Sequence, residues 1–191
     1  MFEDLLNKRK SIGIVGLGYV GLPLALVLAK KFKVIGFDIN LSRINKMKEH
    51  IDPSRELSPT DFEGTDIEFS TELSDLAKAS FYIVAVPTPV DEHKVPDLKP
   101  ILGATSSVAK VLKKGDYVIY ESTVYPGCTE EDCKPILENI SGLKFGLDFK
   151  LGYSPERINP GDKSRTLENI LKIVSGSDEE ALDNISKVYG T

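Results

Sequence analysis

The chain has few cysteines, and their number and spacing exclude a disulfide framework and a zinc site. Its 191 residues contain only Cys128 and Cys133, whereas disulfide-rich proteins carry several pairs and zinc ligands follow other spacings. We therefore predict no metal site. Cys128 follows a Pro-Gly pair, where the start of a helix would lower its pKa and make it reactive. A reduced structural thiol is the alternative that we favour.

The chain also lacks a long apolar run and an excess of positive charge. The longest apolar stretch, from Leu22 to Ala29, is interrupted by Pro23 and is too short to cross a bilayer. The first ten residues lack the apolar run of a signal peptide, so we expect a cytoplasmic protein with no membrane partner. The net charge of -5 provides no basic surface for a nucleic acid, although backbone amides can still bind a small anion.

What is present is an alternation of short apolar runs with helical patterns, which predicts βαβ units. We expect an α/β fold of the Rossmann type, a doubly wound, mostly parallel sheet with helices on both faces, as a single domain over residues 1–191. The predicted strands cover 11–15, 33–37, 67–69, 81–86, 117–120, 149–153 and 170–174. The predicted helices cover 22–29, 41–49, 71–76, 98–112 and 177–189, and the last opens with a Ser-Asp-Glu-Glu capping box.

A glycine-rich loop between the first strand and the first long helix predicts a dinucleotide site. Gly16 permits a tight turn, Gly18 lets the backbone approach a pyrophosphate, and Gly21 lets the helix pack close to the sheet. The helix amino terminus, reached through Tyr19 and Val20, offers free amides to the phosphates. The alternative, glycines that serve only a sharp turn, is less favoured because strand, loop and helix all follow the required order.

The residue that ends the second strand indicates which dinucleotide is bound. Asp38 lies 22 residues after Gly16 in the numbering, where a carboxylate accepts hydrogen bonds from the ribose hydroxyls and repels a 2′-phosphate. The cofactor is therefore predicted to be NAD. Arg43 could in principle accommodate a 2′-phosphate, but with Asp38 in place we predict that it packs near the adenine.

Two later loops follow strands whose carboxyl ends face the glycine loop, where ligands bind in doubly wound sheets. The first contains Pro87 and Thr88, and the second contains Ser122 and Thr123. Prolines stiffen such loops and the hydroxyls can donate hydrogen bonds. Plain turn chemistry is the alternative for either loop alone, but their common placement favours a role in cofactor binding.

Five segments occur in a fixed order along the chain, and their combination is specific. They are 16–23 (GLGYVGLP), 37–40 (FDIN), 86–89 (VPTP), 121–127 (ESTVYPG) and 153–161 (YSPERINPG). With these segments the chain resembles, over its whole length, the amino-terminal NAD-binding domain of the UDP-glucose/GDP-mannose dehydrogenase family. The last segment resembles most the branch that acts on UDP-N-acetylglucosamine or UDP-N-acetylgalactosamine, which supplies uronic acids for capsules, Vi-type antigens and O-antigens.

The resemblance implies a double oxidation of a sugar C6 alcohol to a carboxylate, with two NAD and intermediates bound to a cysteine. It places Thr123 near the nicotinamide and the catalytic water, and Glu156 where a glutamate acts as general base in thioester hydrolysis. A loop carboxylate paired with Arg157 is the alternative role for Glu156. Arg157, Ile158 and Asn159 would line the sugar pocket together with Glu156. Pro160 stands where the glucose-oxidising branch has a second glutamate, which favours an N-acetylhexosamine.

The same resemblance implies that part of the enzyme lies outside these residues. The nucleophilic cysteine, the central helix through which the family dimerises and the UDP-binding domain follow this domain in the family, and neither Cys128 nor Cys133 lies in the corresponding motif. We therefore expect a fragment, monomeric by itself, that binds NAD without turnover. Full-length protein would form a homodimer or larger assembly. The alternatives are a UDP-glucose or GDP-mannose dehydrogenase, a 3-hydroxyacyl-CoA or 6-phosphogluconate type of dehydrogenase, and a non-enzymatic dinucleotide sensor.

Overall fold

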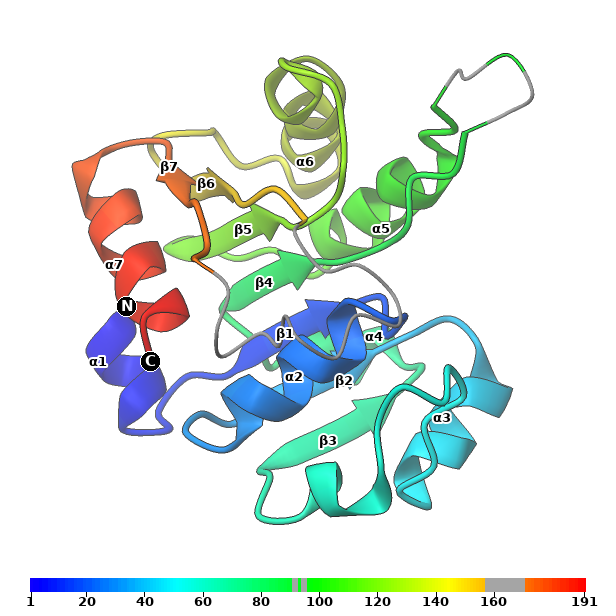
Figure 1. Ribbon diagram of the computed structural model, residues 1–191. Helices are drawn as coiled ribbons and strands as arrows, with labels where there is room; N and C mark the ends of the chain where they lie inside the picture. The colour runs from blue at the N-terminus through cyan, green and yellow to red at the C-terminus, as the bar shows by residue number, and fades with distance from the viewer. Residues whose placement is uncertain (91–92, 94–95, 157–170) are drawn as a thin grey trace.

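A computed structural model describes residues 1–90, 93, 96–156 and 171–191. Its centre is a seven-stranded sheet in the order β3-β2-β1-β4-β5-β6-β7 (Figure 1). The first six strands are parallel, and β7 pairs antiparallel with β6. The strands are β1 (Ile12–Val15), β2 (Val34–Phe37), β3 (Ile67–Ser70), β4 (Phe81–Val84), β5 (Asp116–Tyr120), β6 (Phe149–Tyr153) and β7 (Ser175–Gly176). The predicted doubly wound, mostly parallel sheet is confirmed.

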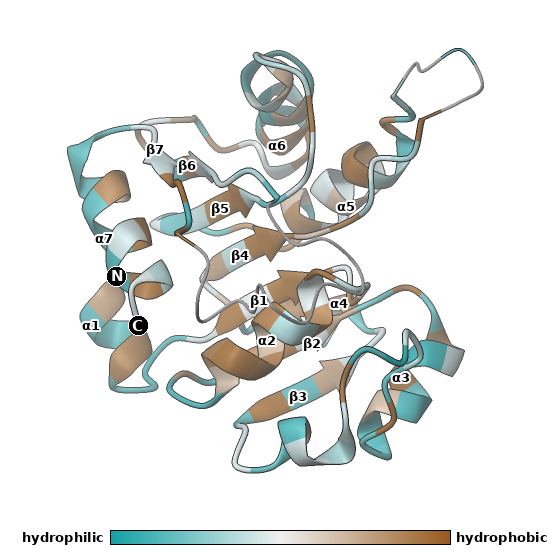
Figure 2. Cartoon of the chain, in the orientation of Figure 1, coloured by the Kyte–Doolittle hydropathy of each residue, from teal (hydrophilic) through white to brown (hydrophobic). Residues whose placement is uncertain are grey.

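The central strands are short and apolar because both faces of the sheet are covered. Every residue of β1, β2, β4 and β5 is buried, as expected for parallel strands between two layers of helices. Alternate side chains of β4 enter different cores: Phe81 and Ile83 join one, and Tyr82 and Val84 join the other. Figure 2 shows the corresponding hydrophobic strands at the middle of the molecule.

Helices cover both faces and divide the core into two parts. One core contains side chains from α1 (Phe2–Leu6), α2 (Gly21–Ala29), α3 (Leu41–Lys48) and α7 (Glu179–Tyr189). The other contains side chains from α4 (Leu73–Leu76), α5 (Lys99–Ala109), the π-helical turn η2 (Thr129–Cys133) and α6 (Lys134–Ser141). A 3₁₀ turn, η1 (Pro59–Phe62), precedes β3. Burial of both faces in this way is the architecture predicted from the alternating pattern.

The first and last helices lie beside each other, so both ends of the chain meet at one side of the sheet (Figure 1). The backbone N–H of Phe2 donates to Oδ1 of Asn184 in α7 at 2.8 Å. Helix α7 starts at the amino-terminal end of β6, because β7 runs antiparallel to that strand and leads directly into the helix. It therefore runs back along the sheet toward the carboxyl ends of the parallel strands.

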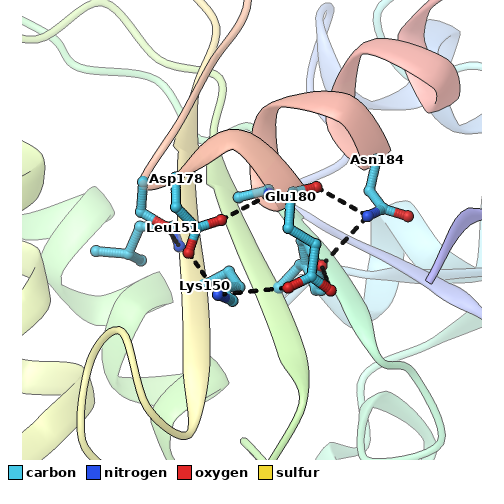
Figure 3. Close-up of polar contacts among 8 residues, drawn as sticks. Lys150, Leu151, Asp178, Glu180 and Asn184 are labelled. Carbon is cyan, nitrogen blue, oxygen red and sulfur yellow. Dashed lines mark hydrogen bonds and ion pairs between the residues drawn. The ribbon is translucent and has the colours of Figure 1, made fainter.

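Several side chains hold the first turns of α7 to the sheet, and we call them the edge cluster (Figure 3). Lys150 of β6 pairs with Asp178 and lies 3.6 Å from a carboxylate oxygen of Glu180. The hydroxyl of Tyr117 donates to Glu180 at 3.3 Å, and Nδ2 of Asn184 donates to that hydroxyl at 3.4 Å. Burial raises the pKa of Tyr117 to about 12, and the negative charge of Glu180 adds to the shift.

The secondary structure departs from the sequence prediction in three respects. The strand expected over 170–174 is wrong for the described residues 171–174, and the strand pairing falls instead on Ser175–Gly176. The capping residue of α7 is Asp178, whose side chain accepts from the N–H of Ala181 at 2.8 Å. Helices α1 and α6 were not predicted, since α1 is short and α6 follows the irregular turn η2.

Candidate functional site

The loops that follow β4 and β5 are held by hydrogen bonds at one end of the sheet, to the neighbouring strand ends and to each other. The N–H of Ala85 donates to Val15 at 2.8 Å, and the N–H of Glu121 donates to Val84 at 2.8 Å. The hydroxyl of Ser122 donates to the carbonyl of Val86 at 2.7 Å. These contacts fix the loops at the carboxyl ends of neighbouring strands, which is where doubly wound folds bind ligands.

The glycine loop has the geometry that its sequence requires. Gly16 has a φ of +92°, and a Cβ added there would lie 2.6 Å from Cγ1 of Val86. A Cβ at Gly21 would lie 1.9 Å from the carbonyl oxygen of Gly16, so only glycine lets α2 approach the loop this closely. A Cβ at Gly18 would meet no atom within 4 Å. The space beside Gly18 is thus open to a ligand.

A hollow of about 520 Å³ lies on one side of the glycine loop, next to Asp38. The Asp38 carboxylate accepts from the N–H of Leu17 at 3.0 Å and from the N–H of Asn40 at 2.9 Å, which fixes its orientation. Arg43 donates to the carbonyl of Leu17 at 2.7 Å and to Ser54 at 3.3 Å. The Asp38 carboxylate at the wall of this hollow is therefore fixed by two backbone N–H groups. The neighbouring guanidinium of Arg43 is already hydrogen-bonded to Leu17 and Ser54.

A second hollow of about 120 Å³ lies on the other side of the loop. It is lined by Tyr19, Val20, Thr88, Ser122, Thr123 and Glu156, together with residues that sequence reasoning did not select, Ala85 and Glu121. The hydroxyl oxygen of Thr88 is buried and has no hydrogen-bond partner among the described residues. Since a buried hydroxyl without a partner is costly, Thr88 fits a site that receives a polar ligand.

Both hollows share Gly18, Val86 and Pro87 in their linings. The two spaces therefore meet at the glycine loop, and an extended ligand can lie across it with one end in each. A dinucleotide has this form, with its pyrophosphate at the loop and a nucleoside on either side. The open space at Gly18, the carboxylate of Asp38 and the hydroxyl of Thr88 match the parts of such a molecule.

The structure brings most of the predicted site residues together. Glu156 and Thr123, which were predicted to act in catalysis, line the same hollow, and the cofactor residues Gly16, Asp38 and Arg43 line the larger one. Gly21 lines neither hollow and serves the packing of α2. Arg157, Ile158 and Asn159, predicted for the sugar pocket, lie outside the described residues. The individual roles of all these residues stay predictions.

Helix α5 contributes a wall of the larger hollow that the sequence did not reveal. Its residues there are Lys99, Pro100, Gly103, Ala104 and Ser107. Small residues on one face of a helix are a weak signal by themselves, and only the packing of α5 beside β4 places this face at the site. Ile39, with 85% of its surface exposed, also borders this hollow directly after Asp38.

The two cysteines are structural, as favoured from the sequence. Both side chains are fully buried in the core beneath α5 and α6. Burial raises the pKa of the Cys128 thiol to about 12, and the neighbouring Cys133 adds to the shift. A thiol with this pKa carries almost no thiolate at neutral pH and is not a nucleophile.

Within the described ranges, no group of three or more His, Cys, Asp or Glu side chains is placed to hold a metal ion. Among the helices of the same residues, none has the length and apolar character needed to span a bilayer.

Known proteins share both the sequence and the fold. Residues 10–191 match the UDP-glucose/GDP-mannose dehydrogenase family in its NAD binding domain. The chain is 53% identical over 183 residues to Protein CapL of Staphylococcus aureus, and 53% identical over 183 residues to the UDP-N-acetyl-D-glucosamine 6-dehydrogenase of Pseudomonas aeruginosa. These matches cover 96% and 95% of this chain and 43% of each relative, so the chain spans less than half of their length.

A solved structure extends the similarity to three dimensions. The NDP-N-acetyl-D-galactosaminuronic acid dehydrogenase of Methanosarcina mazei Go1 superimposes with a TM-score of 0.87 at 32% identity. The match covers 99% of this chain and 44% of that one. The arrangement of strands and loops around the two hollows is therefore that of a dehydrogenase cofactor domain.

Proposed function

The chain belongs to the UDP-glucose/GDP-mannose dehydrogenase family and contains its NAD-binding domain, and on this premise we propose that the whole protein oxidises the C6 alcohol of a UDP-N-acetylhexosamine to a carboxylate with two NAD. The observation that carries the proposal is the position of Thr123 and Glu156 in the smaller hollow, which shares Gly18 with the larger hollow beside Asp38. The two residues predicted to act in catalysis and the cofactor loop thus border adjoining hollows, which together we call the cofactor cleft.

In this proposal the larger hollow takes the adenosine and the smaller one takes the nicotinamide. Asp38 binds the ribose hydroxyls, and its charge disfavours a 2′-phosphate. Arg43 forms part of the adenosine wall, held by Leu17 and Ser54. NAD, when bound there, would supply the hydride acceptor of the reaction. The protein's part is to hold the cofactor and the reacting atoms in position for that transfer.

Thr123 and Glu156 are the residues that we place at the reacting end of the cleft, by which we mean the smaller hollow where the nicotinamide and the sugar would meet. Thr123 positions the catalytic water and Glu156 takes its proton as general base, beside the nicotinamide end of the cleft. The N-acetylhexosamine preference is supported by similarity to the enzyme from Pseudomonas aeruginosa and by 50% identity to the UDP-N-acetyl-D-glucosamine 6-dehydrogenase of Salmonella typhi. Which of the two acetamido sugars is oxidised stays a prediction. The homodimeric state of the full-length protein and its cytoplasmic location stay predictions as well.

The test is turnover by the full-length protein. We expect two NADH for each UDP-N-acetylglucosamine or UDP-N-acetylgalactosamine consumed, and little turnover of UDP-glucose or GDP-mannose. Glu156→Gln should lower kcat by about 10²- to 10⁴-fold, the usual contribution of a general base, while its affinity for NAD stays unchanged. Faster oxidation of UDP-glucose than of either acetamido sugar would contradict the substrate assignment, and an unaltered kcat in Glu156→Gln would contradict the role of that residue.

Cofactor choice is tested on the 191-residue chain by titration calorimetry. Tighter binding of NAD than of NADP is expected. Asp38→Ala should reduce the ratio between the two affinities, because it removes the carboxylate that repels the 2′-phosphate. Tighter binding of NADP to the unaltered chain would overturn the role assigned to Asp38. Measured NADH production by these residues alone would show that they hold every group that the reaction needs.

A further inference from the structure

A buried ion pair lies at the wall of the smaller hollow, and no step of the proposed reaction uses it. Glu121 is the first residue after β5, and its side chain is fully buried. Lys172 pairs with one oxygen of its carboxylate. The hydroxyl of Tyr189, in the last turn of α7, donates to the other oxygen at 2.6 Å. We call Glu121, Lys172 and Tyr189 the site cluster.

The polar groups of the site cluster pair with one another, and both charged side chains are largely shielded from water. Burial raises the pKa of the Glu121 carboxyl, and the charge of Lys172 acts against that shift. Burial also raises the pKa of Tyr189 well above its ordinary value, and the Glu121 carboxylate adds to the shift. The ammonium group of Lys172 lies 5.8 Å from the centroid of the Tyr189 ring. Each oxygen of the carboxylate thus has its own donor.

Stability alone is a weak explanation for such an arrangement. Removing two charges from water costs about as much as their attraction returns, and packed apolar side chains of similar size often stabilise a core at least as well. The edge cluster already fastens α7 to the sheet at its other end, through Lys150 and Asp178. A second, buried ion pair is better explained by what it holds in position.

Glu121 stands where three segments of the site meet. Its N–H donates to Val84 at the end of β4, and its side chain reaches the end of α7 through Tyr189. The next residue, Ser122, is tied to the loop after β4, and its carbonyl accepts from the hydroxyl of Tyr153 at 3.2 Å. Rotation of Glu121 would therefore displace the loop that lines the smaller hollow.

Glu121 also lines the same hollow as the predicted base, Glu156. Its pKa responds to the charge of Glu156, and so does that of Tyr189. Glu121 and Glu156 both line the smaller hollow, and Lys172 compensates the charge of Glu121. Without that compensation, the Glu121 carboxylate would place an unbalanced negative charge at the nicotinamide end of the site.

We propose that Glu121 is a positioning residue of the reacting end of the cofactor cleft: held by Lys172 and Tyr189, it fixes the Ser122–Thr123 loop against the nicotinamide and transmits the position of α7 to it. The role in turnover rests on the proposed function, whereas the role in holding the nicotinamide end follows from the NAD-binding site alone. The two parts can therefore be tested separately.

The first measurement compares NAD with ADP-ribose, which lacks the nicotinamide, as ligands of the full-length protein. Glu121→Gln and Tyr189→Phe should weaken NAD binding several-fold and leave the affinity for ADP-ribose unchanged, because the larger hollow does not contain the site cluster. A loss of overall folding would weaken both ligands equally. Lys150→Met and Tyr117→Phe, which alter the edge cluster, are the matched controls and should change neither affinity.

The second measurement is turnover by the same variants with a UDP-N-acetylhexosamine and saturating NAD. Glu121→Gln and Tyr189→Phe should lower kcat by about tenfold to a hundredfold, the size of effect that a displaced reacting group causes. The KM for the UDP-sugar should change little, and the edge-cluster controls should keep the kcat of the unaltered enzyme. If Glu121→Gln does not fold, Tyr189→Phe still tests the proposal, because it removes one hydroxyl and no charge.

The outcomes separate the two proposals. If the unaltered enzyme turns over no UDP-sugar, the proposed function fails, and the comparison of NAD with ADP-ribose still decides the role of Glu121. If the unaltered enzyme is active and both site-cluster variants match it in kcat and in their preference for NAD, the positioning role is overturned. Equal weakening of NAD and ADP-ribose would overturn it as well, since that result describes a residue that supports only the fold.

Discussion

Helix α7 contributes side chains to two polar clusters, one at each of its ends, and these clusters resemble each other in composition. Each combines a lysine, at least one carboxylate and a tyrosine hydroxyl that donates to a carboxylate. Their surroundings differ. The side chains of Asp178 and Glu180 are 39% and 68% exposed, whereas those of Glu121 and Lys172 are 0% and 8% exposed.

The difference in burial changes what the same chemistry does. In the edge cluster, water screens the charges and can replace a lost partner, so each contact contributes little to stability. In the site cluster a lost partner leaves a charge or a donor buried, which costs several times more. Placement next to the cofactor cleft adds a consequence for function that the edge cluster does not have. Four substitutions test this contrast, from the largest expected effect to the smallest.

Lys172→Met should have the largest effect, because it leaves the Glu121 carboxylate buried without its cation. Breaking a buried pair in this way destabilises a protein by about 3–5 kcal/mol, measured as the free energy of unfolding in urea. The double variant Glu121→Gln with Lys172→Met removes both charges and should recover most of the loss. A double variant that is no more stable than Lys172→Met would contradict the ion-pair explanation.

The same variant has a predicted pH dependence. The folded-state pKa of Glu121 is already raised above its ordinary value of 4.5, mainly by burial, so ionisation of this group opposes folding as the pH rises above that value. Loss of Lys172 raises the folded-state pKa further. The stability difference between Lys172→Met and the unaltered protein should therefore be larger at about pH 8 than at about pH 5. A difference that grows on acidification would have the wrong sign for a buried carboxylate.

Tyr189→Phe should come next, with a loss of about 1–3 kcal/mol in the free energy of unfolding. It removes a hydrogen bond to a buried carboxylate oxygen and leaves that oxygen short of a donor. Tyr117→Phe is the matched control in the edge cluster, where the hydroxyl makes longer contacts of 3.3 and 3.4 Å. Equal losses of unfolding free energy in Tyr189→Phe and Tyr117→Phe would show that the two clusters do not differ in the way that we expect from their burial.

Asp178→Ala should cost about 1 kcal/mol, the usual value of a helix N-cap, because Asp178 both caps α7 and pairs with Lys150. Lys150 and the capped N–H hold the pKa of Asp178 below its ordinary value. This contribution is present above the unfolded pKa near 3.8 and is lost as the pH falls below it. Asp178→Ser keeps a capping oxygen and should retain most of the stability. Equal losses in both variants would argue against the cap.

Lys150→Met should have the smallest effect, within about 1 kcal/mol, as for other partly exposed ion pairs. Added salt should reduce the effect further, because exposed charges are screened. The loss caused by Lys172→Met should respond much less to salt, since the pair is buried. A salt response of the same size at both lysines would show that water reaches the site cluster as readily as the edge cluster.

The sequence predicted the central fold well because its signals are local. Short apolar strands between helical segments identify a buried parallel sheet, and the strand predicted over 81–86 is found at Phe81–Val84. The glycine loop was predictable for the same reason, since the close approach of Gly21 to Gly16 involves neighbours in the chain. Asp38 could be located because the family of folds fixes the distance between the loop and the end of the next strand.

Prediction failed where neighbours in space are distant in sequence. The strand expected over 170–174 was an apolar run, but backbone pairing with β6 selected Ser175–Gly176, which directly precedes α7. Lys99 and Ser107 border the larger hollow only because α5 packs beside β4. No pattern within α5 indicates which of its faces meets a ligand.

The sequence by itself determined a doubly wound fold, a dinucleotide loop and the carboxylate of Asp38, because each depends on steric and hydrogen-bonding rules that act over a few residues or one βαβ unit. Only the tertiary structure decided the surroundings of Glu121. Its partners Lys172 and Tyr189 lie 51 and 68 residues away in the chain. The free energy of a buried charge depends on which distant side chains arrive beside it, and that is settled by packing.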